Sequence, residues 1–163
     1  MNMAGITIAD RKVAVTALER AKESDAPAAA LELEDGRIIT GKTSNLLGAS
    51  AALLLNVLKE LAGFDHSVRI ISPESIEPIQ KLKVEYLKSK NPRLHTDEVL
   101  IALSGSAATN PLAELALSQL PKLKGCQAHT SVMLSDVDIK TFKKLGVQLT
   151  CEAVYEPSRR FKV

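Results

Sequence analysis

Residues 28–42 read AAALELEDGRIITGK, with a strand-like run on either side of the dipeptide Asp35-Gly36. Asp-Gly between two such runs is the strongest short-range signal for a β-hairpin, because this dipeptide tolerates the backbone angles of a tight turn. We therefore expect Arg37 to Thr40 to lie extended in the second strand. This prediction decides the fold class, since residues 36–43 also match a phosphate-binding loop, which needs a curled backbone.

Helix-like and strand-like segments alternate along the rest of the chain. Apolar residues at helical spacing predict helices at 8–23, 45–62, 72–88, 112–120 and 136–145. Short apolar runs predict strands at 67–71, 127–134 and 147–151. The segment 97–108 suits either a buried helix or a strand, and we favour a helix with Thr96 as its N-cap. Thr7, Asn110 and Ser135 are the other expected N-caps.

This order of elements is typical of an α/β fold, a three-layer sandwich around a mixed sheet. We expect an N-terminal helix within residues 1–26 and the sandwich domain in residues 27–156. A helical insert occupies residues 97–121 of that domain, and residues 157–163 form a tail.

Composition argues against several classes of function. Aromatic residues make up 3% of the 163 residues and the net charge is only +2, so neither the stacking platforms nor the basic groove of a nucleic-acid binder is present. The most apolar stretch, residues 46–61, is interrupted by Asn56, Lys59 and Glu60, which argues against a membrane span. Two cysteines do not make a disulfide framework, and we expect a cytoplasmic protein.

The phosphate-loop pattern is the sharpest functional alternative. In that interpretation Gly41, Lys42 and Thr43 would hold the phosphates and magnesium of a nucleotide such as ATP. A phosphate loop needs small residues whose N–H groups converge on an anion. Here the intervening residues are Arg, Ile, Ile and Thr, which favour extended backbone. We therefore favour the strand.

A metal site and a cofactor are not predicted. Cys126 and His129 have a spacing that metal ligands use, but a structural zinc site needs four ligands and no second pair accompanies them. No serine lies in a nucleophile elbow, so the sequence assigns no catalytic residue.

Polar loops at expected helix starts are candidate ligand sites, because such positions bind small anions in α/β proteins. His95 is the group there suited to acid–base work near neutral pH. An enzyme site around it requires Ser44, His95 and Asn110 to converge in one pocket. The alternative interpretation is that the same residues only form turns and helix caps. The ligand-binding candidates are Ser44, Asn45, His95, Thr96, Thr109 and Asn110.

Several long segments together resemble the C-terminal region of a bacterial family, the domain-of-unknown-function 1846 family of the UPF0371 type. The resemblance covers residues 27–156. It is carried by TGKTSNLLGASAALLLN (40–56), ISPESIEPIQKLKVEYL (71–87), NPRLHTDEVLIALS (91–104), AATNPLAELAL (107–117), QLPKLKGC (119–126) and LTCEAVYE (149–156). Members of this family are several-fold longer than this chain.

The resemblance implies a fold similar to that of cytidine deaminase. Deaminases carry a His- or Cys-x-Glu motif at the start of the long helix after the hairpin, and Pro-Cys-x-x-Cys at the next helix. The matching places here are residues 48–52 (GASAA) and 72–75 (SPES), which lack these ligands. Some members are labelled ATP-dependent zinc peptidases, and residues 36–43 explain only the ATP half of that label.

The sequence leaves the function unknown. We favour a non-catalytic binding or assembly module with a degenerate deaminase-like fold. The alternatives are a nucleotide-binding domain that uses residues 36–43 and a small-molecule enzyme site near His95. The partners that the sequence allows are a second copy of the chain and a small anionic ligand.

Overall fold

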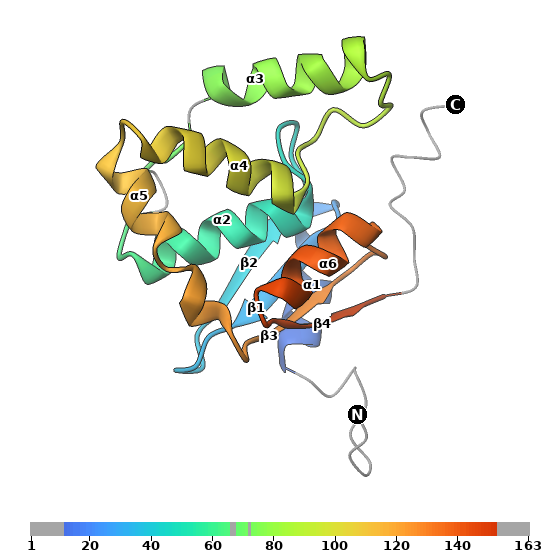
Figure 1. Ribbon diagram of the computed structural model, residues 1–163. Helices are drawn as coiled ribbons and strands as arrows, with labels where there is room; N and C mark the ends of the chain where they lie inside the picture. The colour runs from blue at the N-terminus through green and yellow to red at the C-terminus, as the bar shows by residue number, and fades with distance from the viewer. Residues whose placement is uncertain (1–11, 66–67, 72, 153–163) are drawn as a thin grey trace.

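A computed structural model describes residues 12–65, 68–71 and 73–152 (Figure 1). The described strands are β1 (Ala28–Glu32), β2 (Ile38–Lys42), β3 (Gln127–Thr130) and β4 (Gln148–Cys151). The described helices are α1 (Lys12–Ser24), α2 (Ala49–Leu61), α3 (Pro73–Lys81), the π-helical turn η2 (Leu82–Tyr86), α4 (Thr96–Ala107), α5 (Pro111–Leu117), the 3₁₀ turn η3 (Leu120–Leu123) and α6 (Asp136–Lys144). The expected cap Thr7 and the expected tail 157–163 lie outside these residues.

The hairpin forms as expected, except that the second strand begins at Ile38 and not at Arg37. β1 pairs with β2 in antiparallel register from Ala28 opposite Lys42 to Glu32 opposite Ile38. Gly36 in the turn has a φ of 91°, a conformation that glycine adopts without strain. Because Ile38 to Thr40 lie paired in the ladder, their N–H groups do not converge on a common point.

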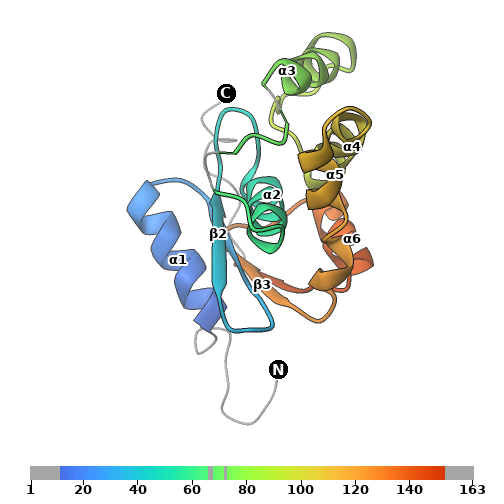
Figure 2. The same ribbon diagram turned by 90° about the vertical axis from the view of Figure 1, so that its left-hand side faces the viewer.

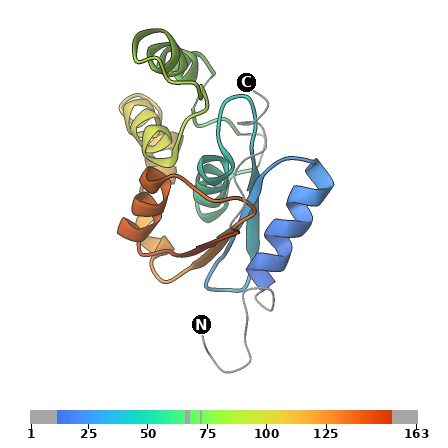
Figure 3. The same ribbon diagram turned by 90° about the vertical axis from the view of Figure 1, so that its right-hand side faces the viewer.

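The four strands form one mixed sheet in the order β2-β1-β3-β4. β1 is antiparallel to both of its neighbours, and β3 and β4 are parallel. Figure 2 shows three layers, with α1 on one face of the sheet and α2 and α4 to α6 on the other, and Figure 3 shows the same layers from the opposite side. The α/β class and the mixed sheet are confirmed.

Side chains of β1 alternate between the two faces of the sheet, so this strand packs against both helical layers. Ala30 packs against Val13 and Ala17 of α1, whereas Ala29 and Leu31 join the larger core around α2. Successive side chains of a strand point to opposite faces, so five residues are enough to line both cores.

α2 is the central helix of the larger core. Leu53, Leu54, Val57 and Leu58 have no exposed surface, as the apolar sequence of this helix predicts. Gly63, just beyond the helix end, has a φ of 82° and occupies the expected stop position. No helix within the described residues combines the length and the apolarity that a membrane crossing needs.

The structure corrects several predictions about local structure. The expected strand at 127–134 ends at Thr130, and the expected helix at 45–62 begins at Ala49. The expected strand at 67–71 does not form in its described part, residues 68–71. Ile70 and Ile71 are buried there without pairing to the sheet, so the apolar pattern predicted burial correctly and strand wrongly. The segment 97–108 is helical, as favoured, but His95 and not Thr96 is the N-cap. Asn110 and Ser135 cap α5 and α6 as expected, each accepting a backbone N–H.

Candidate functional site

Three helices begin at the same side of the molecule (Figure 1). The segments before α2 and α4 run side by side, because Leu94 N–H donates to the carbonyl of Leu46 at 3.0 Å and Gly48 N–H donates to that of Leu94 at 3.3 Å. α6 reaches the same place with its third residue, Asp138, which is 5% exposed. Backbone pairing therefore aligns two helix starts, and α6 adds a carboxylate between them.

Asp138 is the centre of this arrangement. One carboxylate oxygen accepts from the backbone N–H of Thr96 at 2.9 Å and from its hydroxyl at 2.7 Å. The other accepts from the Ser50 hydroxyl at 3.2 Å and lies 3.4 Å from Nδ1 of His95. Burial alone would raise the pKa of Asp138, but the hydrogen bonds from His95 and Thr96 outweigh burial and hold the pKa below its ordinary value. Asp138 is therefore an anion near neutral pH.

His95 takes its orientation from that carboxylate. The hydrogen bond to Asp138 is the largest cause that raises the pKa of His95 above its ordinary value, and partial burial opposes it. The distance of 3.4 Å is near the long limit for a hydrogen bond. The His95 side chain keeps 31% of its surface exposed, so solvent and ligands can reach it.

A small pocket of about 70 Å³ opens beside these groups. The polar residues that line it are Thr43, Ser50, Asn91, Arg93, His95, Ser135 and Asp138. Gly48, the N-cap of α2, also lines the pocket and has no side chain to cap the first N–H groups of that helix. Arg93 and a protonated His95 would place positive charge beside this pocket.

The ligand-binding residues predicted from the sequence lie in different surroundings. His95 lines the pocket, while Thr96 is fully buried and uses its donors on Asp138. The Ser44 hydroxyl accepts from Leu46 and Leu47 N–H in a turn, and the Ser44 carbonyl accepts from Arg93 Nε. The carbonyl of Asn45, an exposed residue, accepts from Gln80.

Thr109 and Asn110 lie at the other end of α4. They line a separate pocket together with Arg69 and Ser75, and Asn110 caps α5 by accepting from Leu112 N–H. The expected convergence of Ser44, His95 and Asn110 in a single pocket is therefore not found.

The phosphate-loop candidates have other neighbours. Gly41 lies against the backbone of α2 at Ala52 and Leu53, which leaves no room for a side chain. Lys42 is exposed at the end of β2, and Thr43 donates its N–H to the carbonyl of Pro27 at 2.9 Å. Of these three residues only Thr43 lines the pocket.

The donors near the pocket do not suit zinc. His95 and Asp138 are the titratable metal-type ligands in its wall, and both oxygens of Asp138 already accept hydrogen bonds. Across the described part of the chain, no three His, Cys, Asp or Glu side chains are grouped so that they could hold a metal ion. Cys126 packs in the core around α2, whereas His129 stands opposite Ala30 and shares the α1 side of the sheet.

Sequence reasoning missed Asp138, Ser50 and Arg93. Asp138 and Thr96 are 42 positions apart, and Ser50 and Asp138 are 88 apart. A usable signal was the second aspartate of the Ser-Asp-Val-Asp segment at 135–138, because the third position of a helix points toward its own start.

Comparison with known proteins places the chain in a family. Residues 9–161 match the family described as "Domain of unknown function DUF1846, C-terminal". The chain belongs to this family. The resemblance of residues 27–156 is thus confirmed, and it extends over nearly the whole chain.

Relatives in the UPF0371 group are bacterial and longer. The chain is 59% identical over 156 residues to a UPF0371 protein of Corynebacterium efficiens, an alignment that covers 96% of this chain and 32% of that protein. It is 50% identical to one of Corynebacterium diphtheriae and 47% identical to one of Streptococcus pneumoniae serotype 4, each over 99% of this chain and 33% of the relative. The chain therefore spans about a third of the length of these relatives, whose names assign no activity.

Proposed function

We propose that this domain binds a small anionic compound, through a phosphate or carboxylate group, and that His95 exchanges a proton with it. The observation that carries the proposal is the pairing of His95 Nδ1 with the buried Asp138 carboxylate. Such pairing fixes the ring and its tautomer, so that Nε2 is the nitrogen available for proton transfer.

The surroundings of His95 support an anionic ligand over a neutral one. Arg93 and the uncapped start of α2 line the same pocket. Asp138 is the carboxylate in the pocket wall, and its charge is matched by four hydrogen-bond donors. A bound anion would meet donors on several sides.

A deaminase-like topology belongs to the same proposal as an analogy of fold. It is supported by the opening hairpin, the buried helix that follows it and the parallel pair β3-β4. The pocket lies at the start of α2, and deaminases carry a metal motif at the start of their corresponding helix. A proton-transferring histidine at the N-cap of α4 would then replace metal chemistry. Fold analogy alone does not determine function, so the site itself must be tested.

Assembly is a second candidate function, favoured by exposed apolar residues on one protruding segment. Tyr86 and Leu87 are each 67% exposed and Leu82 is 48% exposed. Such a surface is typical of protein–protein contacts. It is compatible with a ligand site in the same domain.

A His95→Gln variant tests the anion site. We expect inorganic phosphate to perturb the ring signals of His95 in the wild-type chain, and the affinity for phosphate at pH 6 to fall about tenfold in His95→Gln, because one charge-assisted hydrogen bond is lost. Titration calorimetry would measure both affinities. Sulfate, whose charge is constant in this range, should bind more weakly as the pH rises through the raised pKa of His95.

Lys42→Ala is the matched control, because it removes an exposed cation outside the pocket. Its phosphate affinity should equal that of the wild type. If Lys42→Ala loses phosphate or ATP binding and His95→Gln retains it, the phosphate-loop alternative is correct and the proposal is wrong.

A further inference from the structure

Lys83 is a buried cation on a segment whose apolar residues face outward. It lies in η2 and is 6% exposed, whereas its neighbours Leu82 and Val84 are 48% and 40% exposed. Lysine is almost never buried unless it is paired. The π-helical turn is held by a hydrogen bond from Leu87 N–H to the carbonyl of Leu82 at 2.9 Å, and such turns are frequent at functional sites.

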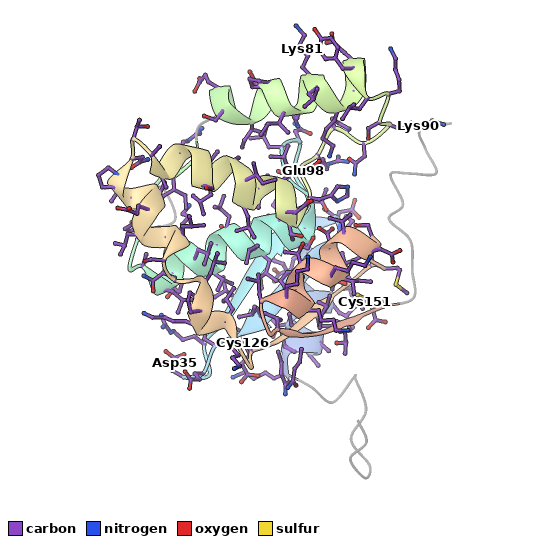
Figure 4. The ribbon with its side chains drawn as sticks, in the orientation of Figure 1. Asp35, Lys81, Lys90, Glu98, Cys126 and Cys151 are labelled. Carbon is purple, nitrogen blue, oxygen red and sulfur yellow. The ribbon has the colours of Figure 1, made fainter. Side chains whose placement is uncertain are left out.

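The ammonium group of Lys83 contacts the chain segment that contains Arg93 and His95, two residues that line the pocket. It donates to the backbone carbonyl of Arg93 at 2.6 Å and to Oε1 of Glu98 at 2.8 Å. The same oxygen of Glu98 accepts from the backbone N–H of His95 at 2.8 Å. Figure 4 shows Glu98 on the side of α4 that faces the arm, which we define as residues 73–87.

We infer that Lys83 is a positioning residue for His95, and that through it the arm controls the geometry of the proton-transfer pocket. The inference rests on the proposed function of that pocket. Lys83 contacts the main chain of Arg93 directly and that of His95 through Glu98, so one ammonium group is connected to two residues that line the pocket.

Other contacts also hold this loop: Leu94 pairs with the main chain of Leu46 and Gly48. Lys83 is the contact that joins the main chain at Arg93 to Glu98, and through it to the N–H of His95. Between Lys83 and α4, the chain at residues 89–95 has no regular helix or sheet ladder, apart from the single bridge between Leu47 and Leu94. A misplacement of about 1 Å is enough to cost a catalytic group much of its effect. A charged hydrogen bond in a partly buried pair resists such a shift better than an exposed one. Movement of the arm would therefore change ligand binding at His95.

The test compares Lys83→Met, which keeps most of the aliphatic stem, with Lys83→Arg, which keeps the charge. Lys81→Met is the matched control, because Lys81 is exposed on the same arm, pointing away from the pocket (Figure 4). Two quantities are measured well below the unfolding temperature: hydrogen exchange of the His95 amide by NMR, and the affinity for inorganic phosphate. Exchange at Ala30 in β1 reports on global stability.

In Lys83→Met we expect the His95 amide to exchange about tenfold faster and phosphate to bind about tenfold more weakly, while exchange at Ala30 changes much less. Lys83→Arg should restore both quantities to within about threefold, since a guanidinium also donates to two acceptors. Lys81→Met should match the wild type. If Lys83→Met does not fold, Glu98→Gln should show the same local change in weaker form.

The inference is overturned if exchange and phosphate affinity in Lys83→Met equal those of the wild type. It is also overturned if hydrogen exchange of the His95 and Ala30 amides becomes faster by the same factor, because Lys83 would then contribute to global stability alone. A wild-type chain that does not bind phosphate contradicts the proposed function instead, and the exchange at His95 then decides the role of Lys83 by itself.

Discussion

A Gly41→Ala variant is expected to lose about 3 kcal/mol or more of its free energy of unfolding, because the new methyl group overpacks a rigid contact. A Cβ built on Gly41 would lie 2.8 Å from the carbonyl carbon of Ala52 and 2.5 Å from Cα of Leu53. Both atoms belong to the backbone of α2, so no side chain can rotate to make room. Unfolding in urea, followed by circular dichroism, measures the loss.

Gly105→Ala is the control for this experiment. Gly105 lies inside α4, is exposed, and a Cβ there would meet no atom within 4 Å. Alanine at a helical position should raise stability by about 0.5–1 kcal/mol. A stable Gly41→Ala protein would show that β2 and α2 are not in close contact, and residues 36–43 would again be open to interpretation as a phosphate loop.

An Asp138→Asn variant is expected to lose about 3 kcal/mol, because one partner of a buried, hydrogen-bonded network is replaced. The amide nitrogen of asparagine can only donate, and it would face either the donors of Thr96 or those of Ser50 and His95. Asp136→Asn, two residues earlier and exposed, removes a similar charge at the start of the same helix. It should cost only about 0.5 kcal/mol, from the weaker helix-dipole interaction.

The pH dependence of stability separates the two groups of the pair. Because the folded pKa of Asp138 is lowered, its contribution is present above the ordinary value of 3.8 and is lost as the pH falls through the folded value. Because the folded pKa of His95 is raised, its contribution is complete below the ordinary value of 6.5 and is lost as the pH rises through the folded value.

Asp138→Asn should therefore lower the free energy of unfolding most at pH values between the folded pKa of Asp138 and that of His95. The curve of stability against pH should be flatter at both ends of this range. Urea midpoints measured from pH 3 to pH 9 give the two curves. Parallel curves for the wild type and Asp138→Asn would contradict the assigned pairing.

Local signals predicted much of the fold. The Asp35-Gly36 turn, the Asn110 and Ser135 caps and the stop after α2 each depend on a few adjacent residues, and all of them form. The segment 68–71 was assigned wrongly because hydrophobic spacing reports burial and not hydrogen-bond partners. Ile70 and Ile71 are buried in both interpretations.

The candidate site was predicted only in part, because local sequence does not report which distant residues a side chain contacts. His95 carries its own chemical signal, since histidine titrates near neutral pH. Asp138 gains its role from packing against α4. Its place three residues after the cap Ser135 indicates that it points toward the start of α6, but not which residues of α2 and α4 it meets there. Asn110 was grouped with His95 because both precede helices, yet α4 separates them by its full length of 12 residues.

The pairing of His95 with Asp138 can be measured most directly by NMR titration of the His95 ring in the wild type and in Asp138→Asn. We expect the pKa of His95 to lie above the ordinary 6.5 in the wild type, to rise further when phosphate is bound, and to be lower in Asp138→Asn. These shifts are the direct sign of the pairing. A pKa of His95 that is at or below 6.5 in the wild type, and that neither phosphate nor the loss of Asp138 changes, would contradict it.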